Sequence, residues 1–156
     1  MQVLLIRHAE AVDATPQRPD PARHLTGMGR IAARTLGERL RWYDCMPSVV
    51  WTSPLVRAAQ TAEIVLAAMG WSGVIEALPV LAPGGDAHEL EALLGAVAPD
   101  AVVMLFGHEP DISGLGSLLT RRADFPGLKK AQAARIIHGR VRWLFGPDDE
   151  APYPCR

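Results

Sequence analysis

Two short apolar runs, residues 2–6 and 101–106, constrain the fold of this chain more than any other feature of its sequence. Both are nearly continuous in Val, Leu, Ile, Met and Phe, which is typical of strands buried on both faces. Shorter apolar runs predict strands at residues 48–51 and 74–77. Helical periodicity predicts helices at residues 30–43, 54–69, 87–97 and 110–119. Strands that alternate with helices predict an α/β fold with a mainly parallel sheet.

The two ends of the chain follow other patterns. Residues 132–137 and 140–145 predict a hairpin around His138-Gly139, with one of its strands at an edge of the sheet. The last ten residues hold three prolines and are expected to form a tail. Residues 11–25 also hold three prolines and show no apolar period. Loops this long are often functional, and a rigid surface connection is the alternative.

Two helix starts carry recognisable capping residues. Ser53 is a good N-cap, and Pro54 fits the first position of the helix that follows. Asp86, with Glu89 three residues later, resembles a capping box. We therefore expect one helix to begin at residue 54 and another at residue 87.

Length and charge exclude several classes of protein. The 156 residues suffice for one domain, residues 1–156, with a sizeable core. Lys and Arg number 16 against 17 Asp and Glu, so the basic surface of a nucleic-acid binder is not expected. No stretch without a charged residue approaches the roughly 20 apolar residues of a membrane-spanning helix. Cys45 and Cys155 form no metal-ligand or redox spacing, which favours a cytoplasmic location.

The residues that follow the predicted strands are candidates for a site, because ligands of open α/β sheets bind beyond the carboxyl ends of the strands. Arg7 and His8 follow the first strand, Arg57 lies one turn into the helix after the second, and His108 follows the fourth. The third strand leads through a Pro-Gly-Gly turn to Asp86. Two arginines and two histidines at one edge would form a cationic cluster in a chain of net charge −1. The sequence therefore predicts an anion-binding site.

Alternatives exist for individual members of this cluster. A cation near a helix N-terminus opposes the helix dipole by about a few tenths of a kcal/mol, and a bound anion would reverse that effect at Arg57. Standing alone, Arg57 would be read as a solvated side chain. His8 and His108 could instead bind a metal, but two neighbouring arginines would repel a cation, so no metal is expected.

Four short segments, in this order along the chain, resemble the motifs of one family. Arg7-His8-Ala9 resembles R-H-G, residues 25–29 resemble L-T-x-x-G, residues 53–61 resemble S-P-x-x-R-A-x-Q-T, and residues 107–110 resemble G-H-x-P. Together, over about residues 1–120, the sequence resembles the histidine phosphatase superfamily, also called the phosphoglycerate mutase-like family. This resemblance implies a three-layer α/β/α sandwich with a mainly parallel central sheet and an antiparallel edge. Residues 81–86 and 128–131 look similar to the SixA-type branch of small phosphohistidine phosphatases.

The resemblance also implies a mechanism. His8 would be the nucleophile and would form a covalent phosphohistidine that water then hydrolyses. Arg7 and Arg57 present planar forks that match phosphoryl oxygens, and His108 would add a third donor. Phosphoryl transfer depends mostly on positioning and charge stabilisation, so neither a metal nor another cofactor is expected.

Two roles are less sharply defined. The leaving group needs a proton, and Asp86 is the candidate acid, although its place at a helix N-cap explains it equally well. Glu89 and Glu10 are the alternatives. An imidazole leaving group is less basic than an alkoxide, so a phosphohistidine substrate tolerates a weak acid. Arg23 in the Pro-rich loop could bind the substrate or could lie in solvent.

The function that we expect is a phosphatase acting on protein phosphohistidine. A phosphomonoesterase or mutase acting on a small phosphorylated metabolite is the alternative within the enzymes. A catalytically silent phosphate-binding module is the alternative outside them, and it stays open because Ala9 replaces the usual Gly after the nucleophile. The expected partner is a phosphorylated protein or a small phosphate ester, not nucleic acid or a membrane. A monomer is favoured over an oligomer.

Overall fold

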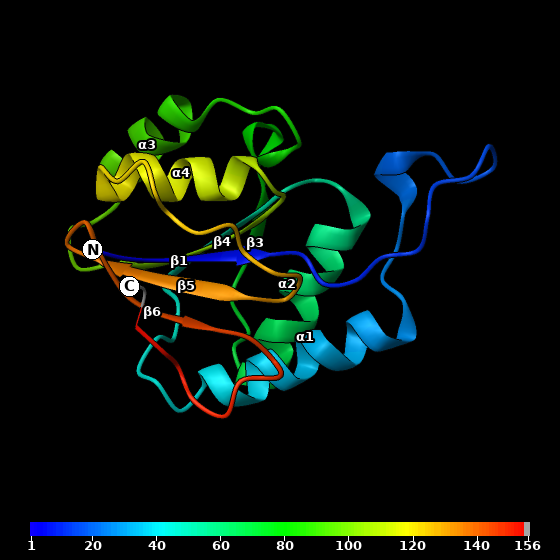
Figure 1. The fold of residues 1–156 in the computed structure, drawn as a ribbon, viewed down its shortest axis with the longest axis horizontal. Helices are drawn as coiled ribbons and strands as arrows, with labels where there is room; N and C mark the ends of the chain where they lie inside the picture. Colours follow the sequence, from blue (N-terminus) through cyan, green and yellow to red (C-terminus); the bar gives the residue numbers. More distant parts are fainter. Residues whose placement is uncertain (155–156) are drawn as a thin grey trace.

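A central sheet separates two pairs of helices in residues 1–154, which are the residues that the computed structural model describes (Figure 1). Cys155 and the end of the predicted tail lie outside them. The strands are β1 (Gln2–Arg7), β2 (Val49–Thr52), β3 (Ile75–Ala77), β4 (Val102–Gly107), β5 (Ala133–Ile137) and β6 (Arg140–Phe145), in the order β3-β2-β4-β1-β5-β6. The four strands β1 to β4 run parallel, β5 runs antiparallel to β1, and β6 runs antiparallel to β5. The predicted mainly parallel sheet with an antiparallel edge is confirmed.

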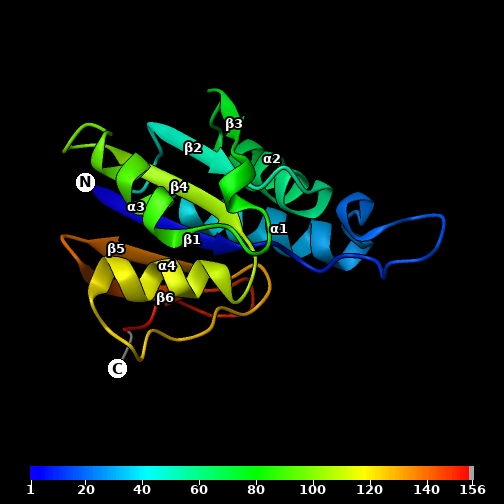
Figure 2. The same ribbon diagram turned by 90° about the horizontal axis from the view of Figure 1, so that it is seen from above.

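The helices cover both faces of the sheet, as the views in Figures 1 and 2 show. The helices are α1 (Gly27–Leu40), α2 (Val56–Met69), α3 (Ala87–Gly95) and α4 (Asp111–Thr120), with short 3-10 turns at Asp20–Ala22 and Pro79–Leu81. Leu4 and Ile6 of β1 pack with α1 and α2, whereas Val3 and Leu5 pack with α3 and α4. Alternate residues of one buried strand therefore serve two cores, which explains why the run is apolar throughout.

Two helices begin away from the predicted residues. α1 starts three residues early, because Thr26 Oγ1 accepts a hydrogen bond from Gly29 N (3.0 Å) and caps the helix. α2 starts at Val56 rather than at Pro54, and the prediction that Ser53 is its N-cap is wrong. Leu55 is the N-cap residue, and Ser53 Oγ accepts from Leu55 N (3.2 Å) in the turn before the helix.

Asp86 is the predicted N-cap of α3, and its carboxylate accepts from His88 N (2.8 Å). The capping box is incomplete, because no hydrogen bond within residues 1–154 joins Glu89 to Asp86 N. The predicted hairpin joins β5 to β6 through His138 and Gly139, both with positive φ, and β6 lies at an edge of the sheet. The Pro-rich loop of residues 11–25 projects beyond the carboxyl end of β1 (Figure 1). No helix within residues 1–154 is long and apolar enough to cross a membrane.

Candidate active site

The register of β1 and β4 brings the two predicted histidines together. Arg7 pairs with Gly107 in the parallel ladder, and His8 N donates to Gly107 O (3.0 Å) just beyond it. His8 and His108 thus leave neighbouring strands at the same edge of the sheet. Their ring centroids are 5.1 Å apart, and the two side chains are buried. The strand-end argument from the sequence therefore placed both residues correctly.

His8 is fixed in one tautomer by its surroundings. Its Nδ1 lies 2.7 Å from Ala9 O, and a carbonyl oxygen can only accept, so Nδ1 carries the proton. Its Nε2 is then unprotonated, and its lone pair accepts a hydrogen bond from Arg57 Nε at 3.3 Å. An unprotonated imidazole nitrogen beside a guanidinium can attack an electrophile that the arginine also binds.

Burial keeps both histidines neutral. It lowers the pKa of His8 to about 4, with a smaller contribution from the charges of Arg57 and Arg7, against the opposing effect of the hydrogen bond to Ala9 O. Burial also lowers the pKa of His108 to about 3, and the charge of Arg57 adds to this effect. Neutral imidazole is the form that a nucleophilic His8 requires.

Two buried nitrogen atoms of the cluster have no hydrogen-bond partner among the described residues. They are Arg7 Nε and His108 Nδ1. The other nitrogen of His108, Nε2, lies 2.7 Å from Ser53 Oγ, so this serine supports the site rather than α2. Buried polar atoms are normally hydrogen-bonded, so an unpaired arginine nitrogen and an unpaired imidazole nitrogen in this cluster are consistent with a place for an anionic ligand.

The guanidinium of Arg57 is held from its far end by the Pro-rich loop. Its Nη1 donates to Asp20 O (2.9 Å) and its Nη2 donates to Asp20 Oδ2 (3.2 Å), while Nε faces His8. Asp20 in turn accepts from Arg23 Nη1 (2.9 Å), and Arg23 Nε donates to Val12 O (2.7 Å). The loop therefore contributes to the site. Sequence reasoning missed Asp20, and the length of this loop was the one available signal.

Arg23 reaches the site through Asp20. These contacts place it beside Arg57 rather than in open solvent, and its charge helps to lower the pKa of both His8 and His108. The two ion pairs of Asp20 also hold the pKa of its carboxyl below the usual range. The structure thus brings Arg23 near the predicted cluster, with its guanidinium engaged by the loop.

Ala9 fits the backbone that follows the nucleophile. It is fully buried, and it is not among the residues with positive φ. Its N–H donates to Thr61 Oγ1 (3.0 Å), and Thr61 lies on α2 one turn after Arg57. The loop therefore accommodates the Cβ that replaces the usual Gly in the motif.

The three candidate acids do not join the cluster directly. The Asp86 carboxylate is exposed and caps α3, and Glu89 is exposed in the first turn of that helix. Glu10 accepts from Thr26 Oγ1 (2.7 Å) at the start of α1. Within residues 1–154, no hydrogen bond links any of these carboxylates to Arg7, His8, Arg57 or His108.

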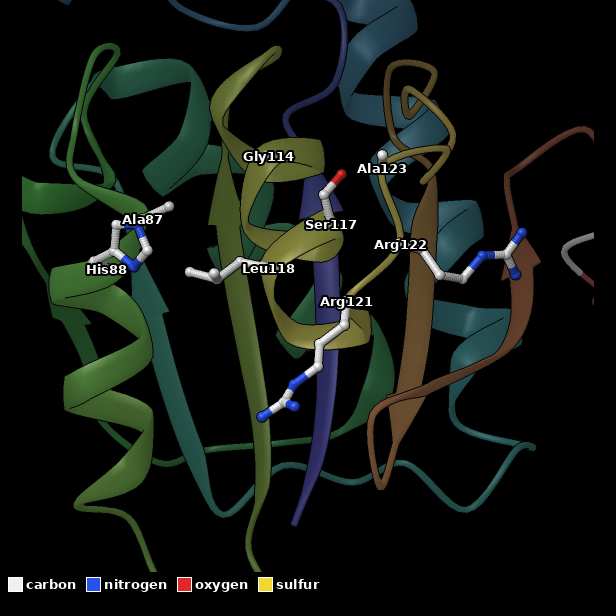
Figure 3. A pocket seen from close by; sticks show the side chains of 8 residues that line it. All are labelled: Ala87, His88, Gly114, Ser117, Leu118, Arg121, Arg122 and Ala123. Carbon is white, nitrogen blue, oxygen red and sulfur yellow. The ribbon is translucent and has the colours of Figure 1, made fainter.

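A second hollow lies between α3 and α4, with a volume of about 440 Å³ (Figure 3). The residues that line it are Ala87, His88, Gly114, Ser117, Leu118, Arg121, Arg122 and Ala123. None of these residues belongs to the predicted cluster, and both His88 and Arg121 are exposed.

The described part of the chain contains no group of three or more His, Cys, Asp or Glu side chains that could hold a metal ion.

Fold and site together define an α/β protein that carries two arginines beside two buried, neutral histidines at the carboxyl edge of its sheet. A model of the histidine phosphatase superfamily, branch 1, matches residues 3–81. The chain therefore belongs to the histidine phosphatase superfamily.

The chain is similar to two SixA proteins over almost all of its length and to a third protein over a shorter segment. Phosphohistidine phosphatase SixA of Escherichia coli is 33% identical over 154 residues, which cover 94% of each chain. The solved structure of a protein histidine phosphatase SixA complexed with tungstate has a TM-score of 0.87 and 28% identity, and the match covers 94% of this chain and 97% of that one. The mitochondrial serine/threonine-protein phosphatase Pgam5 of Drosophila virilis matches over 64 residues at 41% identity, which is 41% of this chain and 22% of Pgam5.

Proposed function

We propose that this chain is a phosphohistidine phosphatase that removes the phosphoryl group from a histidine of another protein. The observation that carries the proposal is the state of His8, whose Nδ1 is tied to Ala9 O while Nε2 faces Arg57. A pure phosphate-binding module needs donors, but it does not need a neutral imidazole with an oriented lone pair. The full-length similarity to a phosphohistidine phosphatase supports the same substrate class.

The reaction has two displacements at phosphorus. The Nε2 lone pair of His8 attacks the phosphoryl group, the P–N bond to the substrate imidazole breaks, and that imidazole leaves as a neutral group because the released electron pair takes up a proton from the acid or from water. Water then attacks the phosphohistidine, the Nε2–P bond breaks, and inorganic phosphate leaves with the protons of that water, which restores neutral His8. In each step, negative charge on the three equatorial phosphoryl oxygens must be stabilised. Arg7, Arg57 and His108 supply hydrogen-bond donors for these oxygens.

The unpaired nitrogens mark where the phosphoryl oxygens bind. Arg7 Nε and His108 Nδ1 each gain an acceptor when the anion enters. Arg57 Nε lies 3.3 Å from His8 Nε2, the atom that attacks. Arg23 contributes charge from behind Asp20. These groups can bind and stabilise the phosphoryl group without a metal.

Asp86 is the acid that we propose for the leaving group. It lies on the segment that follows β3, at the same edge of the sheet as the other strand ends. The leaving imidazole is a weak base, so we expect a modest contribution from this residue. A phosphate ester, whose alkoxide is far more basic, would depend on the acid much more strongly.

The experiment offers four substrates to the wild type and to His8→Ala. They are a protein phosphorylated on histidine, free phosphohistidine, a protein phosphorylated on serine and a small phosphate ester. We expect the wild type to prefer the phosphohistidine protein and His8→Ala to lose about 10³-fold or more in rate. His88→Ala, which changes an exposed histidine, is the matched control and keeps wild-type activity.

Each outcome of this panel has a definite meaning. Release of phosphate from none of the substrates by the wild type would show that the chain is a binding module. A strong preference for the serine phosphate or the small ester would leave the mechanism in place and refute the phosphohistidine assignment.

A further inference from the structure

We propose that Glu109 is a positioning residue that sets the orientation of Arg7 through the backbone of Leu128. This inference rests on the proposed function, because it concerns how the phosphate pocket is held in shape. Glu109 directly follows His108, in the turn between β4 and α4. It makes no contact with His8 or Arg57 in the described residues, so any effect on the reaction must pass through another group.

Arg7 depends on a single backbone oxygen for its orientation. Its Nη1 donates to Leu128 O (2.9 Å), and its Nε is buried without a partner. No other acceptor for this guanidinium exists within residues 1–154. A guanidinium fork recognises phosphoryl oxygens only in a defined plane, so the position of Leu128 O determines how well Arg7 Nε meets the ligand.

Leu128 lies in a segment that has no helix or strand to hold it. Residues 121–132 run as turns and irregular backbone from α4 to β5. Phe125 anchors the middle of this segment against Gly116 of α4, where a Cβ would come within 2.5 Å of the phenyl ring. The Leu128 side chain is buried, but apolar packing alone does not fix the direction of its carbonyl group.

Leu128 O shares its peptide plane with Lys129 N, which donates to Gln132 Oε1 (2.9 Å). The carboxylate of Glu109 supplies a second constraint, on the peptide unit that precedes Leu128. Its Oε1 accepts from Leu128 N (2.6 Å), and its Oε2 accepts from Ser113 Oγ in the first turn of α4. One residue of the irregular segment therefore has its N–H fixed by Glu109 and its C=O bound to Arg7. Hydrogen bonds to an ionised carboxylate are roughly twice as strong as neutral ones, which suits a contact that must hold a loop. The turn that contains His108 and Glu109 thus also influences the orientation of Arg7, through Leu128.

Three variants test this connection. Glu109→Ala removes the acceptor, Glu109→Gln keeps an amide oxygen that can accept from Leu128 N, and Ser113→Ala removes the other contact of the carboxylate. We expect Glu109→Ala to lower kcat/KM about tenfold and to weaken the binding of inorganic phosphate by a similar factor. Glu109→Gln should recover most of both losses, and Ser113→Ala should stay close to the wild type.

A double-mutant cycle separates positioning from general stability. If Glu109 acts through Arg7, then Glu109→Ala causes no further loss of kcat/KM or of phosphate binding in an Arg7→Ala background. Additive losses, or a Glu109→Ala protein that binds phosphate and turns over like the wild type, would refute the inference. A wild type that hydrolyses no phosphohistidine while phosphate binding still follows the cycle would refute only the proposed function.

Discussion

The proposed phosphate site has two walls, which are built in different ways. One wall consists of side chains at the carboxyl ends of β1 and β4 and in the first turn of α2. In this strand-end wall His8, Arg57 and His108 are all less than 10% exposed. The other wall consists of irregular segments, the Pro-rich loop with Asp20 and the segment with Leu128. The Asp20 side chain is 51% exposed although it holds Arg57.

This difference separates the groups that react from the groups that hold them. The strand-end wall inherits its geometry from the sheet, whose backbone register makes His8 and His108 neighbours. The loop wall has no such register and depends on charged hydrogen bonds to Arg57 and Arg7. Substitutions in the strand-end wall should therefore cause large losses of activity. Substitutions in the loop wall should cause smaller losses, because they change only how the reacting groups are held.

The largest effect is expected from the strand-end wall itself. Arg57→Ala removes the guanidinium that faces Nε2 of His8, so we expect kcat to fall about 10³-fold, as for other arginines that stabilise phosphoryl transfer. Steady-state kinetics with a phosphohistidine protein measure this. Arg30→Ala, on the exposed start of α1, is the control and should be unaffected. A loss of less than tenfold for Arg57→Ala would mean that the two walls do not divide the work in this way.

The pH dependence of stability should also come mainly from the buried wall. The pKa values of His8 and His108 are lowered to about 4 and about 3, so the unfolded chain binds protons more readily than the folded one. Stability is therefore fully present above about pH 6.5 and is lost as the pH falls toward 4 and 3. Each histidine should cost about 2 kcal/mol between pH 7 and pH 4.5.

Urea unfolding at several pH values measures this loss. His108→Gln should flatten the dependence between pH 7 and pH 4.5, whereas His88→Ala should leave it unchanged. The carboxyl of Asp20, whose pKa is lowered, contributes only at more acidic pH, as the pH falls below its ordinary range. Equal slopes for the wild type and His108→Gln would contradict the neutral, buried state of this histidine.

The loop wall should give a smaller effect. Asp20→Ala removes the carboxylate that holds Nη2 of Arg57 and leaves the backbone contact in place, so we expect kcat/KM to fall about tenfold. Asp13→Ala changes an exposed acid of the same loop and should have no effect. An increase in kcat/KM for Asp20→Ala would instead identify Asp20 as a competitor of the phosphoryl group for Arg57.

The smallest effect concerns Asp86. Asp86 is the N-cap of α3, so Asp86→Ala should lower the free energy of unfolding by about 1 kcal/mol. Asp86→Asn should preserve this free energy, because asparagine is also a good N-cap. If Asp86 is also the acid, both variants lose activity alike, and they lose more on a phosphate ester than on phosphohistidine. Parallel assays on the two substrates, with thermal unfolding, separate the roles. Full activity in Asp86→Asn on both substrates would exclude the acid role.

The sequence predicted the strand-end wall because its logic is local. A buried strand followed by a polar residue can be recognised in a few letters, and Arg7, His8 and His108 were found in that way. The parallel pairing of the strands then brings these residues together, because the carboxyl ends of parallel strands lie at one edge of the sheet. The same local reasoning predicted Asp86 at the start of α3.

The loop wall could not be predicted in this way. Asp20 and Arg57 are 37 residues apart, and nothing in the residues around Asp20 marks the partner. Leu128 acts through its backbone, which leaves no trace in the residue type. The early start of α1 was hidden by Gly29, which reads as a turn signal. It is required because a Cβ there would lie 2.1 Å from Glu10 O.

The central claim is that His8 Nε2 receives the phosphoryl group. The direct measurement is to mix the enzyme with a protein carrying radiolabelled phosphohistidine, to quench within milliseconds, and to locate the label by mass spectrometry. We predict a transient label on His8 that is stable to base and lost in acid, and none in His8→Ala. Hydrolysis that proceeds at the wild-type rate with no label on His8, or with the label on another residue, would contradict the account.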